Sequence, residues 1–133
     1  MEAAIISMLL ADAGVAAIVG TRVYPLSRPQ GSAFPSISLF SVDGGPEYAD
    51  DGETGHEVRR VQVDGWAMTY TETKAIAAAV RNVLSFFFGT AFGVFFPVII
   101  LEDERDFREG GGDQTDYPFH VTLDFVVTTG EAP

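Results

Sequence analysis

The stretch Glu57–Phe88 joins a strand directly to a helix, and this unit limits what the chain can fold into. Polar and β-forming apolar residues alternate over Val58–Met68 without a proline, which predicts a strand. Thr69 and Glu72 have the spacing of a capping box, in which the Thr69 hydroxyl accepts an orphan N–H. Apolar residues then recur at helical spacing, which predicts an amphipathic helix over Tyr70–Phe88. We expect the rest of the chain to pack on this strand–helix unit.

The remaining elements are one N-terminal helix and three strands, predicted over Met1–Val19, Ser36–Val42, Pro97–Leu101 and Phe119–Val127. Gly14 should break the N-terminal helix, and Asp12 can cap a short second turn. This order predicts an α+β fold, an antiparallel sheet of about four main strands with two helices packed on one face. At 133 residues the chain should form a single domain, 1–133.

Alternation assigns the strand side chains to two faces of the sheet. Val61 and Val63 point toward the helices, whereas Trp66 falls on the opposite, polar face. That face also carries the side chains of Arg60, Gln62, Asp64, His120, Thr122 and Asp124. Trp66 is therefore either core at a sheet edge or the anchor of an interface with a partner.

Two stretches are acidic and rich in glycine. Asp43–Glu57 reads as a long, mobile hairpin tip, either solvated only or functional, with Tyr48, Asp50 and Asp51 as candidate contacts. Glu102–Asp116 contains a triple-glycine turn. The final residues, 128–133, should be frayed.

The segment Val83–Leu101 contains no charged residue and is long enough to cross a bilayer. Gly89, Gly93 and Pro97 interrupt it, which favours a helix end, a buried loop and a strand over a membrane span. The loop contains a surplus of aromatic residues, and we take three of them as candidate interface contacts: Phe92, Phe95 and Phe96.

Charge and composition exclude several functions. The formal net charge is −11, with 8 Lys and Arg against 19 Asp and Glu, so the chain lacks the basic footprint of a nucleic-acid-binding protein. The chain has no cysteine and hence no disulfide framework or thiolate nucleophile, which fits a reducing compartment. Glu2, with no Lys or Arg before Arg22, does not resemble the start of a secretory signal.

No motif for catalysis is present. Phosphate-binding loops and nucleophile elbows are absent from the sequence. His56 and His120 lie far apart, and the run Asp50–Glu53 lacks the spacing of a calcium loop. We therefore expect no enzyme activity, no cofactor and no metal site.

The chain resembles the tail-completion, or tail-terminator, proteins of long-tailed bacteriophages and related gene transfer agents. The likeness rests on the order and spacing of segments along the whole chain: Leu10–Val15, Val19–Pro25, Pro29–Gly31 with Pro35, Arg60–Asp64 with Trp66, Thr69–Glu72 before an alanine-rich helix, and Phe119–Phe125. The loop Phe86–Phe96 is richer in phenylalanine than is usual for the family.

This resemblance implies a structural virion protein that caps the head-proximal end of the tail tube. By resemblance it forms a hexameric ring, contacts the major tail tube protein and the head-closure or connector protein, and lets DNA pass through its lumen without a membrane partner. It would lie in the neck region of the tail, after assembly in the bacterial cytoplasm. The alternatives are a head-closure ring, an acidic protein-binding module, and a hydrolase that uses clustered carboxylates and a metal.

Overall fold

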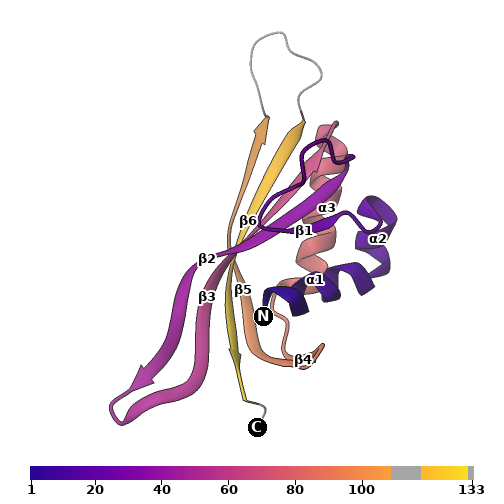
Figure 1. Cartoon of the computed structure of the whole chain (residues 1–133). Coiled ribbons are helices and arrows are strands. Elements are labelled where there is room, and N and C mark those ends of the chain that lie inside the picture. Colours follow the sequence, from indigo (N-terminus) through magenta and orange to yellow (C-terminus); the bar gives the residue numbers. More distant parts are fainter. Residues whose placement is uncertain (109–117, 132–133) are drawn as a thin grey trace.

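The computed structural model describes residues 1–108 and 118–131, so the triple glycine Gly110–Gly112 lies outside the described residues. One sheet has three helices on one face (Figure 1). The elements are α1 (Glu2–Ala11), α2 (Ala13–Val19), β1 (Val23–Pro25), β2 (Ser36–Ala49), β3 (Gly52–Ala67), α3 (Tyr70–Leu84), β4 (Gly89–Ala91), β5 (Val94–Arg108) and β6 (Phe119–Gly130).

The sheet has six strands in the order β1-β2-β3-β6-β5-β4. The α+β class and the helix-covered face are confirmed, and the four predicted strands correspond to β2, β3, β5 and β6. The estimates of about four strands and two helices were too low. The additional strands β1 and β4 have three residues each, too few to show an alternating pattern. Because β1 runs parallel to β2, the sheet is mixed and not purely antiparallel.

The core lies between the helices and one face of the sheet. Val61 and Val63 of β3 are buried there, as predicted, together with Val121, Leu123 and Phe125 of β6. The helix α3 covers these strands with its buried residues Ile76, Val80 and Leu84. Full burial of each such side chain stabilises the fold by about 1.5–3 kcal/mol.

The N-terminal helix is broken at Asp12 and not at Gly14. The backbone of Asp12 is extended, and its carboxylate accepts a hydrogen bond from the N–H of Val15 at 3.0 Å. Asp12 thus caps α2, while Gly14 lies inside that helix. The predicted cap is confirmed, and the cap itself is the cause of the break, because an N-cap residue leaves helical geometry.

The helix α3 starts as predicted and ends early. The Thr69 hydroxyl accepts a hydrogen bond from the N–H of Glu72 at 3.2 Å, which confirms the cap. The helix stops at Leu84, four residues before the predicted end at Phe88. Phe86 has a positive φ of 62° and its N–H donates to the carbonyl of Ile99 at 2.7 Å, so the chain turns toward the sheet there.

The acidic stretch Asp43–Glu57, which we call the arm, is a β-hairpin and not a structureless loop. β2 and β3 continue through it, and Ala49 pairs with Gly52 around the turn Asp50–Asp51. The arm projects from one end of the molecule (Figure 1). The low β-propensity of its residues predicted a loop, but ladder hydrogen bonds between the two strands override propensity. Gly44, with a φ of 140°, lies beside the register shift between Ser41 and Asp43.

Two more strands are longer than predicted. β5 extends from the expected Pro97–Leu101 to Val94–Arg108, and it includes the first part of the second acidic stretch, Glu102–Arg108. The carboxylate of Glu104 there accepts hydrogen bonds from Lys74 at 2.8 Å and from Arg81 at 2.7 Å, so its charge is compensated by α3. β6 continues to Gly130, so the prediction of fraying from residue 128 was wrong for these residues.

Among the described residues, no single helix has the length and apolar character to span a membrane. The pair α1 and α2 meets both criteria only when joined, and the two helices are bent by 86° relative to each other.

Candidate functional site

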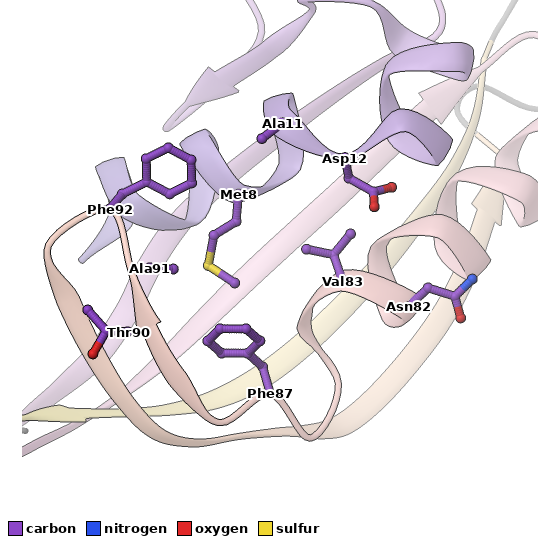
Figure 2. Close-up of a pocket in the computed structure, with 9 residues that line it drawn as sticks. All are labelled: Met8, Ala11, Asp12, Asn82, Val83, Phe87, Thr90, Ala91 and Phe92. Atoms are coloured by element: carbon purple, nitrogen blue, oxygen red, sulfur yellow. The ribbon is translucent and has the colours of Figure 1, made fainter. Parts of the chain in front are cut away.

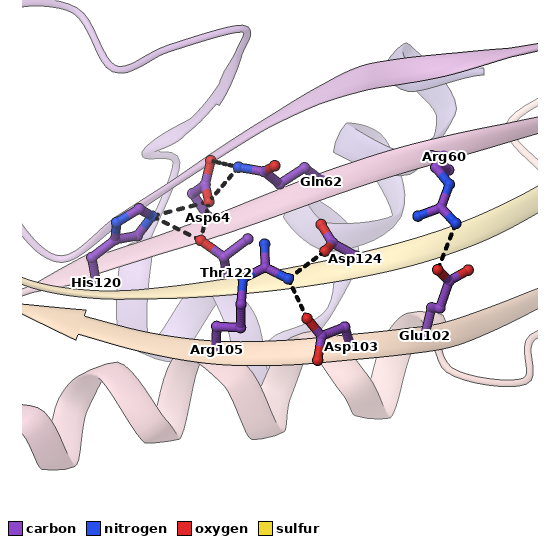
Figure 3. Close-up of polar contacts among 9 residues, drawn as sticks. All are labelled: Arg60, Gln62, Asp64, Glu102, Asp103, Arg105, His120, Thr122 and Asp124. Atoms are coloured by element: carbon purple, nitrogen blue, oxygen red, sulfur yellow. Dashed lines mark hydrogen bonds and ion pairs between the residues drawn. The ribbon is translucent and has the colours of Figure 1, made fainter.

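A polar network lies on the sheet face opposite the helices, which we call the outer face (Figure 3). Its centre is Asp64, whose side chain is almost completely buried. Asp64 Oδ1 accepts a hydrogen bond from the Thr122 hydroxyl at 2.7 Å and lies 3.0 Å from His120 Nε2. Gln62 Nε2 donates to the same carboxylate at 3.0 Å. These contacts give the buried carboxyl group its hydrogen-bond partners, so the network stabilises the sheet face.

Trp66 lies beside this network and is half-buried. Its ring stacks on the imidazole of His120, with centroids 3.9 Å apart and an angle of 8° between the planes. The indole N–H donates to the Ser38 hydroxyl at 3.3 Å. The guanidinium of Arg28 lies over the Trp66 ring at 5.6 Å and over the Phe34 ring at 4.0 Å. Trp66 therefore fixes the segment before β2 onto the outer face.

Charged side chains continue across the outer face. Arg105 Nη1 donates to Asp124 at 2.7 Å and also contacts Asp103, and the hydrogen bond to Asp124 is the main cause of a raised Arg105 pKa. Arg60 pairs with Glu102 at 2.6 Å. These acids and bases pair with each other, as Figure 3 shows. Within residues 1–108 and 118–131 there is no group of three or more His, Cys, Asp or Glu side chains able to hold a metal ion.

An open, mainly apolar groove lies on the helix side, between α1, the end of α3 and β4 (Figure 2). It has a volume of about 630 Å³. Its lining residues are Met8, Ala11, Asp12, Asn82, Val83, Phe87, Thr90, Ala91 and Phe92. Asp12, its one acid, is engaged in capping α2. The groove can therefore receive an apolar side chain, and it carries no group arranged for catalysis.

The predicted aromatic contacts separate into surface and core. Phe92 is 60% exposed at the rim of the groove, and the half-buried Phe95 meets Phe88 edge to face at 5.6 Å between centroids. Phe96 is completely buried among the core residues, so its side chain cannot reach a partner. The sequence analysis missed Phe86 and Phe88, which are 79% and 69% exposed. We call Phe86, Phe88 and Phe92 the aromatic patch.

The other predicted contacts lie at the tip of the arm. Tyr48 is 68% exposed, and Asp50 and Asp51 form the exposed turn. Tyr48, Asp50 and Asp51 are remote from Trp66, since they occupy the far end of the hairpin. The structure thus places Trp66 on the outer face, Phe92 in the aromatic patch, and Tyr48, Asp50 and Asp51 at the arm tip.

Sequence reasoning also missed Arg28. Its guanidinium donates to the Ser36 hydroxyl and to the carbonyl of Ser32, both at 2.8 Å, and its partial burial lowers its pKa. Within the described part of the chain, Arg22 and Arg28 have no carboxylate in ion-pair distance. The sequence does contain a signal for these residues, because Arg22 and Arg28 are the only Lys or Arg residues before Arg59.

Comparison with known proteins gives two results. Residues 3–130 match the family of the tail completion protein gp17. The fold is similar to a chain in the structure of the virion of a native gene transfer agent particle, with a TM-score of 0.78 and 23% sequence identity. That similarity covers 98% of this chain and 95% of the other. No curated protein matches the chain in sequence.

Proposed function

The chain belongs to the tail completion protein gp17 family, and on that basis we propose that this structural tail protein caps the head-proximal end of the tail tube as a ring. The ring is hexameric and joins the tail to the head-closure or connector protein. The observation that carries the proposal is the family match, which extends over residues 3–130 and so over nearly the whole chain. The similarity in fold to a chain of a gene transfer agent virion supports it.

The surfaces of the subunit suit a ring. A ring of identical subunits needs two different surfaces that meet head to tail and close. The arm and the aromatic patch are separate surfaces, and neither is covered within the chain. The three exposed rings of the aromatic patch lie in the uncharged stretch Val83–Leu101, where subunits of equal charge can approach without repulsion.

The charge of the subunit suits a channel for DNA. A basic lumen would hold the phosphates of passing DNA, whereas an acidic lumen repels them. The outer face carries more acids than bases, with Glu102, Asp103 and Asp124 against Arg60 and Arg105 in its charged row. We propose that this face or the arm lines the channel.

Electron microscopy of particles made with and without the gene tests the proposal. Without the protein, we expect tails of irregular length and filled heads that lack tails. Added protein should appear as a ring at one end of each tube. Normal tails in its absence would contradict the proposal, and binding to isolated heads but not to tubes would indicate a head-closure protein instead.

A further inference from the structure

Identical copies of this chain repel each other electrostatically, because each copy has a formal charge of −11. Pairing of bases of one copy with acids of the next would offset this repulsion. Most of the described bases are not available to pair with another copy, because they already form ion pairs inside the chain. These bases are Arg59, Arg60, Lys74, Arg81 and Arg105. The side chain of Arg108 is outside the described part. Two described bases, Arg22 and Arg28, remain.

Arg22 and Arg28 lie together at the β1 edge of the sheet. Arg22 directly precedes β1, and its Nε donates to the carbonyl of Pro35 at 2.7 Å. The guanidinium of Arg28 is held against Phe34 and Trp66 by the contacts described above. Both side chains are thus pre-organised, which lowers the entropy cost of pairing with a carboxylate. Leu26 lies between them in sequence, 75% exposed and with a φ of 66°.

The arm tip carries the complementary charge. Four of its acids have no basic partner among the described residues: Glu47, Asp50, Asp51 and Glu53. The acids at the base of the arm differ, since Asp43 and Glu57 approach Arg60 and Arg59. The exposed ring of Tyr48 adds an apolar contact to the acidic tip.

These two surfaces cannot meet within one chain. Val23 pairs with Ile37 near the start of β2, whereas the arm turns after Ala49 at the end of β2. At about 3.3 Å per residue, the strand from Ile37 to Ala49 spans roughly 40 Å. The arm and the β1 edge accordingly lie at opposite ends of the molecule (Figure 1). Two different surfaces that lie far apart on the subunit suit a head-to-tail contact.

We propose that the arm tip of one copy docks on the Arg22–Arg28 edge of the next copy. Asp50 and Asp51 pair with the two guanidinium groups, and Tyr48 packs on Leu26. The contact repeats from copy to copy and closes the ring, so this inference rests on the ring proposed above. A tail-tube protein that uses the same arm is the alternative outcome of the test.

Cross-linking tests the contact directly, because the chain has no cysteine of its own. Asp51→Cys places a thiol on the arm tip, and Gln30→Cys places one in the exposed segment beside Arg28. The two variants are mixed with a short bismaleimide, as free protein at low salt and on assembled tails. We expect a cross-linked heterodimer, and from the double variant a ladder that ends at the closed ring. Ala75→Cys, exposed on α3, replaces Gln30→Cys as the matched control and should give no product above background.

Charge reversal tests the chemistry of the contact, with the arm thiol moved to the exposed Ala49→Cys so that both tip acids can be changed. Asp50→Lys with Asp51→Lys should lower the yield of the cross-link between Ala49→Cys and Gln30→Cys about tenfold. Arg22→Glu with Arg28→Glu should lower it to a similar extent. The chain carrying all four charge changes should recover the cross-link, because the pairing is restored with opposite sign.

Two further variants control the charge reversal. Glu2→Lys with Glu131→Lys changes the net charge by the same amount as the two arm substitutions and should leave the cross-link yield unchanged. If Arg22→Glu with Arg28→Glu does not fold, Arg22→Gln with Arg28→Gln should weaken the contact with the fold retained. An undiminished cross-link in the arm variant would show that Asp50 and Asp51 do not pair with the edge.

The outcomes separate this inference from the proposed function. Absence of the arm-to-edge cross-link both in free protein and on tails overturns the inference, even if the protein caps tubes. A cross-link from the arm only to a tube protein also overturns it. Conversely, a cross-linked ring that fails to bind tube ends would leave the contact in place and contradict the proposed function.

Discussion

Trp66 is the only tryptophan of the chain, and its ring lies flat on the imidazole of His120. Such a stacked pair contributes about 0.5–1.5 kcal/mol beyond the area it buries. Trp66 also donates its N–H to Ser38 and lies below Arg28. Trp66 therefore packs within the subunit, and its role as the anchor of an interface stays a prediction.

We expect Trp66→Ala to lower the free energy of unfolding by about 2–3 kcal/mol, less than a fully buried aromatic because the ring is half-buried. Trp66→Phe should recover most of this loss, because it keeps a ring against His120. Chemical denaturation of both variants measures the difference. If Trp66→Ala unfolds at the same denaturant concentration as the parent protein, the stack has no structural role.

Lys74, like Arg81, joins α3 to the acidic part of β5. Its ammonium donates to Glu104 at 2.8 Å and to Asp106 at 3.1 Å. The hydrogen bond to Glu104 is the main cause of a raised Lys74 pKa. A raised pKa in the folded state means that this pairing stabilises the fold below the ordinary lysine pKa of 10.5 and is lost as the pH rises through the folded value.

We expect Lys74→Met to lower the free energy of unfolding by less than about 1 kcal/mol at pH 7, because the ammonium is partly exposed. The difference from the parent protein should begin to decrease above pH 10.5, as the ammonium loses its proton. Denaturation curves at pH 7, 9 and 11 measure it. Tyr70 also contacts Asp106, so Tyr70→Phe is a control that keeps Lys74 in place. A difference that stays constant across this range would show that the ammonium charge is not involved.

At the scale of elements, the sequence predicts strongly patterned segments and misses segments defined by their neighbours. The cap at Thr69, the alternation of β6 and the apolar face of α3 are local signals, and the structure confirms them. β1 and β4 have no local pattern and exist because longer strands offer an edge. The arm was mistaken for a loop because glycine and aspartate disfavour strands, whereas pairing with the opposite strand decides the outcome.

The sequence also predicts some of the candidate contact residues correctly and misplaces others. Tyr48, Asp50, Asp51 and Phe92 are exposed, as a contact surface requires. Phe96 was misplaced, because a run of aromatic residues does not reveal which ring points into the core. The groove beside Phe92 joins residues of α1, α3 and β4, and only the folded chain brings these together.

The arm should be dispensable for folding. Few of its residues contribute to the core, since its strands are exposed near the tip. We expect that replacement of residues 46–57 by Asn-Gly, a favoured hairpin turn, will leave the melting temperature of the body within a few degrees and abolish ring assembly. Calorimetry and sedimentation measure the two effects. Unfolding of the body on this replacement would show that the arm is part of the cooperative unit.

At the scale of the whole molecule, several large apolar side chains are exposed to solvent at positions where the backbone φ is positive. Leu26, Phe86 and Phe92 are the non-glycine residues with positive φ in the described chain, and each is at least 60% exposed. A left-handed backbone costs a residue with a side chain about 1–2 kcal/mol. Exposed apolar side chains contribute little to the stability of the free subunit. We expect a partner to cover these exposed side chains in the assembled particle.

We therefore expect Phe88→Ser with Phe92→Ser to change the free energy of unfolding by less than about 1 kcal/mol, because exposed side chains contribute little to folding. The same variant should fail to form rings or to bind tube ends, because it loses the apolar area of the aromatic patch. Val42→Ser with Met68→Ser removes two exposed apolar residues elsewhere and should assemble normally.

Phe96→Ser should instead destabilise the fold by about 3–5 kcal/mol, because its ring lies in the core. Calorimetry reports folding, and electron microscopy of tube ends reports assembly. Normal capping by the Phe88 and Phe92 variant would show that the aromatic patch faces solvent in the particle as well.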